Sequence, residues 1–440
     1  MINQKKMEYM SSNRDELRDA DLTPEAQALA DRLVLSTITV QEHRLIANFL
    51  NDKNYDVEFR EMNVLPFNLM MECLPNFVHA HGGQIVFSMR INHNGEINRP
   101  KKKNLKINGI QRHILYGGMM FLYFPEKPVV VEVDDDPSQD KAIRVMACDG
   151  AGVFFDQWVT FSRRNNYLFG RAFFANGDLI ERKRRYGWTD IVLPEETRQA
   201  IQTHVGDFLA HREQLKRLGA KPRRGIILSG PPGTGKTLIG KILADTLGVS
   251  FLWVTPRHID SVRSFADLLS LARFIAPTVI FLEDLDLFAE ERDRGGWMGL
   301  GELMNQLDGA VDNEDIVTIA TTNRLDVIEK ALRNRPGRFD RVLTIDVMDK
   351  VCRGQMVAKL LKPAQISAED TGYLVCATDG YTGAQIEELI NTLFIWAVNA
   401  NNQNTQPDKN GQVSVDRKLI NFALNEVQVD VKTRLGFHAA

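Results

Sequence analysis

The stretch Gly230-Pro-Pro-Gly-Thr-Gly-Lys-Thr237 decides the fold, because it fits the phosphate-binding pattern G-x-x-x-x-G-K-S/T at every specified position. It follows the short apolar segment Gly225–Ser229, which predicts a strand. Apolar residues at helical spacing come after it, at Ile239, Ile242, Leu243 and Leu247. A strand, a glycine-rich loop and a helix in this order predict a site for a nucleoside triphosphate, whose phosphates face the positive end of the helix.

The residues of this loop have separate parts in that prediction. Glycines let the backbone wrap around a polyphosphate with its amide groups pointing inward. Lys236 can reach the β- and γ-phosphates, and the Thr237 hydroxyl can bind Mg²⁺. The sequence therefore predicts that ATP and Mg²⁺ bind at Gly230, Pro231, Pro232, Gly233, Thr234, Gly235, Lys236, Thr237 and Leu238.

The composition limits the classes of protein that fit. With 440 residues and 44% hydrophobic content, the chain can form about two to four globular domains. A net charge of −3 gives it no general attraction to nucleic acid or anionic membranes. Its first residues carry no apolar run typical of a secretory signal, and no window approaches the roughly 18 apolar residues of a membrane span. We therefore expect a soluble, cytoplasmic protein without a membrane partner.

Cysteine usage agrees with that compartment. The four cysteines are widely spaced and form no C-x-x-C pair, which favours free thiols in a reducing environment; they are Cys73, Cys148, Cys352 and Cys376. His79 and His81 lie near Cys73, but the spacing fits no standard zinc pattern. We expect no metal other than the Mg²⁺ that accompanies the nucleotide.

The first half of the chain changes its pattern near residue 55. A helical pattern over 22–50 predicts a helical N-terminal segment at 1–54, and 55–185 is predicted to form a mainly antiparallel β-rich accessory domain. Asn94-Gly95 and Asn176-Gly177 are good hairpin turns. The short apolar runs that predict strands are Ile85–Ile91, Met119–Phe124, Val129–Val133, Ile143–Cys148 and Gly170–Phe174.

The second half alternates strand and helix patterns from residue 186 to about 348, which predicts an α/β domain with a parallel sheet. It begins with a helix that has Ile201, Val205, Phe208 and Leu209 on one face. Residues 349–440 are predicted to be helical, and their clearest helix places on one face Ile386, Leu389, Ile390, Leu393, Phe394 and Ala397.

Hydrolysis of ATP needs acidic residues beside the phosphate loop, and the sequence supplies them in order. The apolar run Val279–Leu282 ends in Glu283 and Asp284. A second apolar run, Ile316–Ala320, is soon followed by the amide of Asn323. The segment Arg335-Pro-Gly-Arg-Phe-Asp-Arg341 then presents guanidinium groups that suit a phosphate. Each could be an ordinary solvated loop by itself, but their order after a phosphate loop favours a catalytic set.

This ordered set resembles the AAA family of ATPases over residues 186–400. The resemblance implies a P-loop NTPase sheet with a C-terminal helical lid, a Walker A loop at 230–237 and a Walker B strand at 279–284. It further implies that Asn323 senses the γ-phosphate and that Arg335 and Arg338 are arginine fingers acting on a neighbour's ATP. Members of the family assemble as rings, usually hexamers. Nucleotide contacts are implied for Asp190, Ile191, Gly383 and Ala384.

The resemblance also implies how the acids work. Glu283 would share the metal side of the site with Thr237, and Asp284 would position the attacking water, while Lys236 neutralises phosphate charge. The family's usual order is Asp-Glu, so the second acid here is one methylene shorter. Because the placement of water matters on a scale of about 1 Å, this departure predicts slow hydrolysis.

A second departure concerns substrate handling. Protein-threading members carry an aromatic–apolar–glycine loop after the strand that corresponds to Phe251–Val254, and the sequence here has no such tripeptide. Trp253 is therefore predicted to be a core residue, and chain threading is not expected. Together with the Glu-Asp order and Leu303–Gly309, this is similar to the AAA ATPases that assemble mitochondrial respiratory complex III, which have an N-terminal membrane helix that this chain lacks.

Three functions remain open for the whole chain. The leading hypothesis is a ring-forming ATPase that remodels a protein partner bound through residues 1–185. The second is a nucleic-acid-dependent ATPase, which is suggested but not favoured by the basic clusters at 101–103, 163–164 and 182–185; the alternative places these clusters in a solvated loop, a hairpin end and a linker. The third is a slow ATP-gated assembly switch, which the reversed acid pair mildly favours.

Overall fold

The computed structural model describes residues 42–51, 54–91, 97–107, 110–125, 127–134, 141–220, 223–259, 262–287, 306–307, 313–332, 339–404 and 413–434. The chain divides into two compact units between Leu179 and Ile180, with residues 263–276 grouped with the first unit. The predicted boundary at 185/186 is close to this division but stays a prediction. Within the described ranges, no helix has the length and apolar character needed to cross a bilayer.

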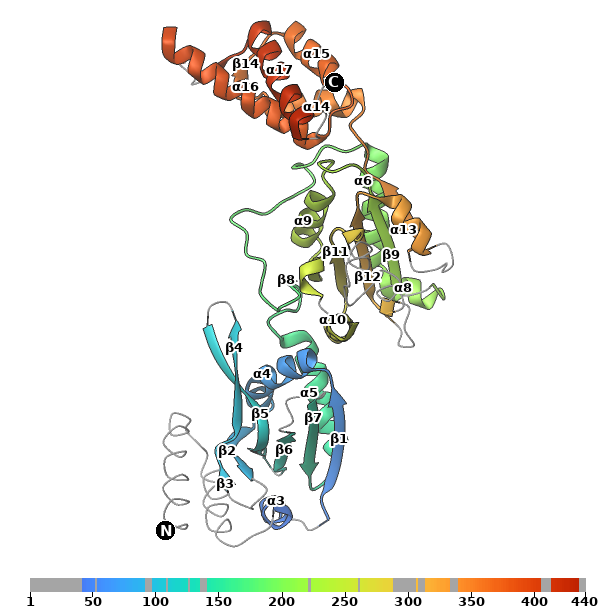
Figure 1. The fold of residues 1–440 in the computed structure, drawn as a ribbon. Coiled ribbons are helices and arrows are strands. Elements are labelled where there is room, and N and C mark those ends of the chain that lie inside the picture. The colour runs from blue at the N-terminus through green and yellow to red at the C-terminus, as the bar shows by residue number, and fades with distance from the viewer. Residues whose placement is uncertain are drawn as a thin grey trace. The chain divides into compact units, whose positions relative to one another are not determined.

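The second unit is built on a parallel sheet in which β13, β9, β12, β11 and β10 are neighbours in that order (Figure 1). Its central strands are apolar and almost fully buried, as expected for a sheet covered on both faces. This arrangement is the α/β fold of a P-loop NTPase, as predicted. The strands are β9 (Arg223–Ser229), β10 (Ser250–Val254), β11 (Thr278–Leu282), β12 (Ile316–Thr322) and β13 (Arg341–Thr344).

Helices connect and flank these strands. The predicted helix with Ile201, Val205, Phe208 and Leu209 on one face forms, and all four side chains are buried. It is continued by a π-helical turn at Gln202–Asp207, where the backbone accommodates one extra residue per turn. The helices are α6 (Glu195–Ile201), α7 (Phe208–Ala210), α8 (Arg212–Arg217), α9 (Lys236–Thr246) and α13 (Leu325–Leu332), with a 3₁₀ turn at Pro256–His258. The helix α10 (Val262–Phe274) is grouped, from Arg263 onward, with the first unit.

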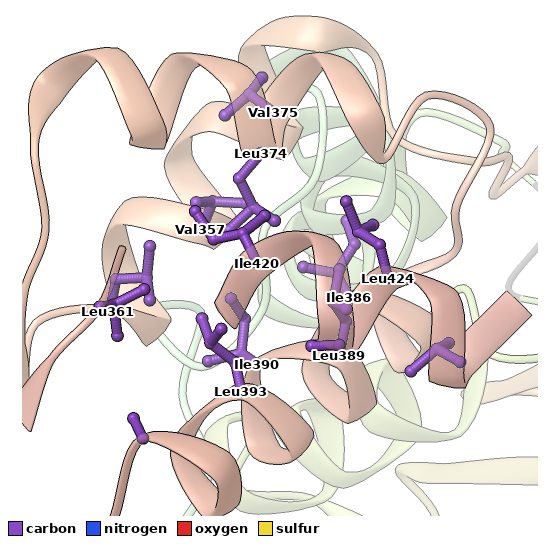
Figure 2. Packing of buried hydrophobic residues seen from close by; sticks show 14 residues of the cluster. Val357, Leu361, Leu374, Val375, Ile386, Leu389, Ile390, Leu393, Ile420 and Leu424 are labelled. Atoms are coloured by element: carbon purple, nitrogen blue, oxygen red, sulfur yellow. The ribbon is translucent and has the colours of Figure 1, made fainter. Parts of the chain in front are cut away.

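A helical subdomain completes the second unit. It contains α14 (Lys350–Leu360), α15 (Ala368–Ala377), α16 (Gly383–Asn404) and α17 (Arg417–Arg434), with a short parallel pair β14 (Ala364–Gln365) and β15 (Val413–Ser414). The predicted apolar face of α16 is confirmed. Figure 2 shows it packed against the neighbouring helices, with a shared core that includes Val357, Leu374, Ile386, Leu389, Ile390, Leu393, Ile420 and Leu424.

The first unit contains an antiparallel sheet with the strand order β1-β7-β6-β5-β2-β3, and β4 pairs with β5. The antiparallel prediction for this region is therefore correct, and the runs at 85–91 and 129–133 are strands as expected. The strands of this sheet are β1 (Asp56–Met62), β2 (Gln84–Ile91), β3 (Ile97–Asn98), β4 (Lys101–Ile107), β5 (Ile110–Tyr123), β6 (Val129–Val133) and β7 (Lys141–Ala147). A further short strand, β8 (Ala172–Phe174), does not belong to it.

Two helices in the first unit are absent from the sequence-based description. The helix α4 (Val64–Ala80) contacts β5 and β2, and α5 (Ala151–Asn165) contacts β1 and β7. Trp158 of α5 is fully buried, and its indole N–H donates to the Met70 carbonyl of α4 at 3.1 Å. A third helix, α3 (Glu42–Leu50), buries its apolar face in a core shared with β2, β5 and β6, which confirms helix at the end of the predicted 22–50 segment.

Several local predictions can be compared with the structure. Asn176-Gly177 forms the expected tight turn, with Gly177 at φ 86° and the Phe174 carbonyl accepting from its amide at 2.9 Å. Asn94-Gly95 lies outside the described residues. The lysines at 101–103 belong to β4, which pairs with the next strand β5, and not to a loop. Arg163 and Arg164 lie in the last turn of α5 and not at the end of a hairpin.

Candidate nucleotide site

The phosphate loop has a backbone shape that only glycine permits. Gly230, Gly233 and Gly235 have φ angles of 155°, 82° and 102°, which L-residues with side chains rarely adopt. A Cβ atom added at Gly230 would lie 1.9 Å from the carbonyl oxygen of Ile345, which follows β13. The loop therefore needs hydrogen at this position, both for its conformation and for its contact with a neighbouring strand end.

The other two glycines allow close approach of two segments that the sequence placed at the nucleotide. A Cβ at Gly235 would be 2.9 Å from Ile191 Cδ1, and a Cβ at Gly233 would be 3.0 Å from Ala384 Cβ. The Gly233 carbonyl accepts from the Ala384 amide at 3.0 Å. The loop is thus bordered by the Asp190-Ile191 segment and by the first residues of α16.

Lys236 is the first residue of α9 and is held inside the loop. Its Nζ donates to the carbonyl oxygens of Gly230 and Pro231, at 2.7 Å each. Burial lowers the pKa of this ammonium, while the carboxylates of Asp284 and Asp286 act in the opposite direction. A partly desolvated cation enclosed by backbone oxygens is placed to interact strongly with a polyphosphate.

Glu283 and Thr237 meet although 46 residues separate them. Thr237 Oγ1 donates to Glu283 Oε1 at 2.6 Å. The approach of α9 to the sheet makes this contact possible, since a Cβ at Gly240 would lie 2.5 Å from the ring of Phe281. Phe281 and Glu283 are two residues apart along the same strand direction, so they point to the same face. Glycine at 240 therefore brings the start of α9 down onto the end of β11.

Asp284 has a left-handed backbone, with φ 52°. Its amide donates to Thr321 Oγ1 at 3.0 Å, and the Leu285 amide donates to the Thr321 carbonyl at 2.8 Å. Aspartate tolerates this conformation better than most residues with a side chain. Burial raises the pKa of the Asp284 carboxyl, the charges of Glu283 and Asp286 raise it further, and Lys236 lowers it.

The end of β12 supplies the polar amide. The Asn323 backbone N–H donates to Asp286 Oδ1 at 3.2 Å, and Asp286 is buried. The exposed Asn323 side chain belongs to the pocket lining together with Asp284 and Thr321. Asp286 and Thr321 were not identified from the sequence. Their signal was present, because both lie in the same strand-end motifs as the predicted residues.

A pocket of about 400 Å³ contains most of these groups. It brings together the predicted Asp190 and Ile191, the loop residues 232–238, Asp284, Asn323, Gly383 and Ala384. Gly230, Pro231 and Glu283 are not in the lining, although Glu283 bonds the lining residue Thr237. Lining residues that sequence reasoning missed are Val192, Lys241, Thr321, Met348, Met356 and Glu387.

The two borders of the pocket are held by specific hydrogen bonds. Asp190 accepts from the Gly187 amide at 2.8 Å and from Arg184 at 3.0 Å, and these bonds keep the pKa of Asp190 below its usual range, the amide being the larger cause. Lys359 of α14 donates to the Asp190 carbonyl at 2.8 Å. The lid helix is therefore tied to the segment that lines the opposite border.

The start of α16 has a capping arrangement. Thr382 Oγ1 accepts from the Gln385 amide at 3.4 Å, and the Gln385 side chain accepts from the Thr382 amide at 2.8 Å. This reciprocal pair satisfies amides that a helix N-terminus otherwise leaves without partners. It fixes the end of α16 whose residues Gly383 and Ala384 line the pocket. The predicted arginine fingers, Arg335 and Arg338, lie outside the described residues.

The residues present suit a nucleotide with its magnesium ion. The glycine loop encloses a space that side chains would fill, and Lys236 Nζ donates to the Gly230 carbonyl of this loop. Thr237 and Glu283 offer a hydroxyl and a carboxylate oxygen beside each other, and Mg²⁺ prefers such oxygen ligands. The arrangement can bind the charged end of a nucleoside triphosphate and hold a metal ion next to it.

Comparison with known proteins agrees with this geometry. Residues 226–347 match the family described as "ATPase family associated with various cellular activities (AAA)". This range begins in β9, ends after β13 and contains the phosphate loop, both acids and Asn323. These residues are therefore similar to an AAA ATPase domain.

Several curated proteins to which the chain is similar are proteases or protease components. The chain is 32% identical over 236 residues to the chloroplastic ATP-dependent zinc metalloprotease FTSH 7 of Arabidopsis thaliana, covering 50% of this chain and 29% of the relative. It is 37% identical over 238 residues to the mitochondrial inner membrane m-AAA protease component yta12 of Schizosaccharomyces pombe, covering 50% and 30%.

The longest of these matches is also partial. The ATP-dependent zinc metalloprotease FtsH of Mesomycoplasma conjunctivae is 30% identical over 306 residues, covering 65% of this chain and 40% of the relative. The chain therefore spans well under half the length of these relatives. Among solved structures, the FIGL-1 AAA domain in complex with ADP is 25% identical with a TM-score of 0.46, covering 58% of this chain and 91% of that one.

Proposed function

We propose that this chain hydrolyses ATP with Mg²⁺ in the pocket of the second unit and uses the resulting motion to remodel a protein partner. The observation that carries the proposal is the 2.6 Å hydrogen bond between Thr237 Oγ1 and Glu283 Oε1. It joins the hydroxyl of the phosphate loop to the carboxylate at the end of β11, beside a pocket that Lys236 and Asp284 also line.

The residues of the chain have distinct tasks in this proposal. When bound, Mg²⁺ would neutralise the charge of the phosphates. Thr237 and Glu283 are the residues that would hold it. The Lys236 ammonium offsets phosphate charge, the Asp284 carboxylate accepts a hydrogen bond from the attacking water, and the Asn323 amide contacts the γ-phosphate.

Hydrolysis is proposed to be slow. The Asp284 side chain is one methylene shorter than glutamate, and its left-handed backbone is fixed by Thr321 through two hydrogen bonds. A short side chain on a fixed backbone has few ways to adjust its reach towards a water molecule. A misplacement of about 1 Å can lower a rate by about a hundredfold.

The assembled form is proposed to be a ring, with six subunits as in other AAA proteins. Arg335 and Arg338 of a neighbouring subunit would then stabilise the charge that develops during phosphoryl transfer, which can raise the rate by several orders of magnitude. The support is the Arg335–Arg341 motif and the AAA family match, since members of this family generally form hexameric rings.

The partner is proposed to be a protein that binds through residues 1–185 and is moved without being threaded. Trp253, the aromatic residue nearest to where a threading loop would lie, is only 5% exposed and packs on Phe281 at 4.6 Å between ring centroids. Its burial supports a role in the core. The soluble, cytoplasmic location expected from the sequence belongs to the same proposal.

Two more specific roles receive less support. Two of the named relatives are described as zinc metalloproteases, yet none of the nine histidines here is followed by glutamate, so these 440 residues contain no H-E-x-x-H motif. The proposal therefore does not extend to proteolysis by this segment. The resemblance to the AAA ATPases that assemble mitochondrial complex III rests on the Glu283-Asp284 order, the missing aromatic–apolar–glycine tripeptide and Leu303–Gly309, and it stays a prediction.

Nucleic-acid dependence is the competing function, and local pairing weakens its case. Arg182 forms an ion pair with Asp245 at 2.6 Å, and Arg184 forms one with Asp190 at 3.0 Å. Half of the cluster at 182–185 is therefore engaged within the second unit. The lysines at 101–103 lie on β4, and this alternative would rest on that strand.

The first experiment is steady-state ATP turnover of the full chain, with and without single- and double-stranded DNA, at two salt concentrations. We expect Lys236→Ala to lose nucleotide binding. Asp284→Asn should bind nucleotide with at least a tenfold loss of turnover, since the water loses the charged carboxylate that can take its proton. Asp149→Asn is the matched control, because this carboxylate is 72% exposed in the first unit. Arg338→Ala should keep binding and lose turnover.

The outcomes separate the three functions. Turnover that does not respond to DNA supports a protein partner. Stimulation that fades at higher salt would replace this proposal with the nucleic-acid reading. Assembly that is unchanged by Asp284→Asn, with a very low basal rate, would favour the ATP-gated switch. Normal turnover in the Asp284→Asn variant would overturn the site assignment itself.

A further inference from the structure

Glu283 is held by two donors, and only one of them belongs to the phosphate loop. Thr237 Oγ1 donates to Oε1 at 2.6 Å, while the indole N–H of Trp253 donates to Oε2 at 3.0 Å. Each carboxylate oxygen therefore has its own donor. Hydrogen bonds that involve an ionised group are stronger than those between neutral groups, so both contacts restrict the side chain.

Trp253 is itself fixed by its surroundings. It lies in β10 opposite Phe281 of β11 in a parallel register, and their ring centroids are 4.6 Å apart. Phe251, two residues earlier on the same face, is 6.0 Å away. With 5% exposure, the indole is a rigid group whose single N–H points at the end of the neighbouring strand.

The length of Glu283 explains why such a group is useful. Glutamate has one more rotatable bond than aspartate, and ordering it costs side-chain entropy. A ligand whose conformation is fixed in advance avoids that cost when the metal binds. The Trp253 N–H holds Oε2, which leaves Oε1 beside the Thr237 hydroxyl. An aspartate at 283 would be one methylene shorter and would not reach the indole in the same way.

We propose that Trp253 is a positioning residue for Glu283, and that the two form a matched pair that orients the carboxylate for Mg²⁺. This inference rests on the proposed function. The family usually has aspartate at the position of Glu283, and the proposal explains the longer side chain by its hydrogen bond to Trp253 on the adjacent strand. Trp253 touches neither nucleotide nor metal in this proposal and acts only through the orientation of Glu283.

Trp253→Phe tests the proposal, because it keeps an aromatic ring against Phe281 and removes the N–H. The measurement is the affinity of a fluorescent ADP analogue in EDTA and at a series of Mg²⁺ concentrations, which gives the apparent Mg²⁺ affinity and requires no turnover. We expect unchanged affinity in EDTA and a loss of about tenfold in Mg²⁺ affinity, which is typical when a residue behind a metal ligand is removed.

Trp396→Phe is the matched control. Its indole N–H also donates to a glutamate, Glu426 Oε2 at 2.6 Å, but this pair lies between α16 and α17 of the helical subdomain. It should leave the affinity for ADP unchanged with and without Mg²⁺. If Trp253→Phe does not fold, benzothienylalanine at position 253 keeps the bicyclic ring and replaces only the N–H.

A double-substitution cycle decides between positioning and packing. In a Glu283→Asp background, Trp253→Phe should have no further effect on Mg²⁺ affinity, because the shorter carboxylate no longer bonds the indole. An equal loss in both backgrounds would overturn the proposal, as would a lower melting temperature with unchanged Mg²⁺ affinity. If Mg²⁺ does not strengthen ADP binding in the unaltered chain, the proposed function fails first.

Discussion

The nucleotide site of the second unit and the core of the first unit differ in how their structure is encoded. In the nucleotide site, the predicted residues belong to short sequence motifs, such as Gly230–Thr237, and these motifs predict their functions. In the first unit, α4 is buried along most of its length, including Pro66–Leu74, and has apolar residues nearly all round. A motif of functional residues can thus be recognised from a few consecutive residues, whereas a helix buried on all sides cannot be predicted without knowing the elements that pack around it.

The strongest test of this contrast compares two glycines, one in each region. Gly230→Ala would place a methyl group 1.9 Å from the Ile345 carbonyl, and Gly118→Ala would place one 2.5 Å from the Met89 carbonyl, both at positive φ. We expect Gly230→Ala to lose all detectable ADP binding, because the loop cannot keep its shape. Gly118→Ala should leave ADP affinity unchanged, as measured by fluorescence titration.

The second half of that test is local stability. Hydrogen exchange should show faster exchange in β2 and β5 for Gly118→Ala, since its clash lies between these strands. It should show no such change there for Gly230→Ala. A loss of ADP binding in the Gly118→Ala protein would contradict the view that the nucleotide site depends on its own local contacts.

The next test concerns the helices that the sequence did not reveal. The side chain of Trp158 is 0% exposed, and its indole N–H donates a hydrogen bond to the Met70 carbonyl. Trp158→Ala should destabilise the first unit by about 3 to 5 kcal/mol, as expected when a large buried aromatic is removed. Hydrogen exchange in α4 and α5 should report it. Unchanged protection of these helices would show that their packing does not depend on Trp158.

The smallest effect concerns the thiols, with one buried cysteine in each region. Burial is the main cause that raises the pKa of Cys73 to about 12 and of Cys352 to about 11. Cys148 and Cys376 are exposed. Because the thiolate is the reactive form, a thiol reagent at pH 8 should modify the two exposed cysteines quickly and the two buried ones slowly.

Repeating the thiol measurement with ADP compares the effect of nucleotide on the two regions. With ADP at ten times its Kd, opening of the second unit should be suppressed about tenfold, so Cys352 should react about tenfold more slowly. Cys73 in the first unit should react at an unchanged rate. Mass spectrometry of the alkylated peptides gives both rates, and equal protection of the two thiols would indicate that nucleotide stabilises the whole chain.

Some elements were missed for a physical reason. A short apolar run can be a buried strand or a buried helix, and periodicity cannot distinguish them when all sides are covered. This applies to α4, where Met70, Met71, Cys73 and Leu74 are all buried. By contrast, α16 has a polar face towards solvent, so its pattern predicted the helix and its core residues correctly.

The sequence by itself determined the strand–loop–helix order at 225–247, the acids at the end of β11, the amide after β12 and the main helix of the lid. These features depend on backbone geometry and on neighbours within a few residues. Only the tertiary structure decided that Thr237 meets Glu283, that Trp253 holds its second oxygen and that Ile345 closes on Gly230. Such contacts depend on which strands the sheet places side by side, and no local pattern specifies that order.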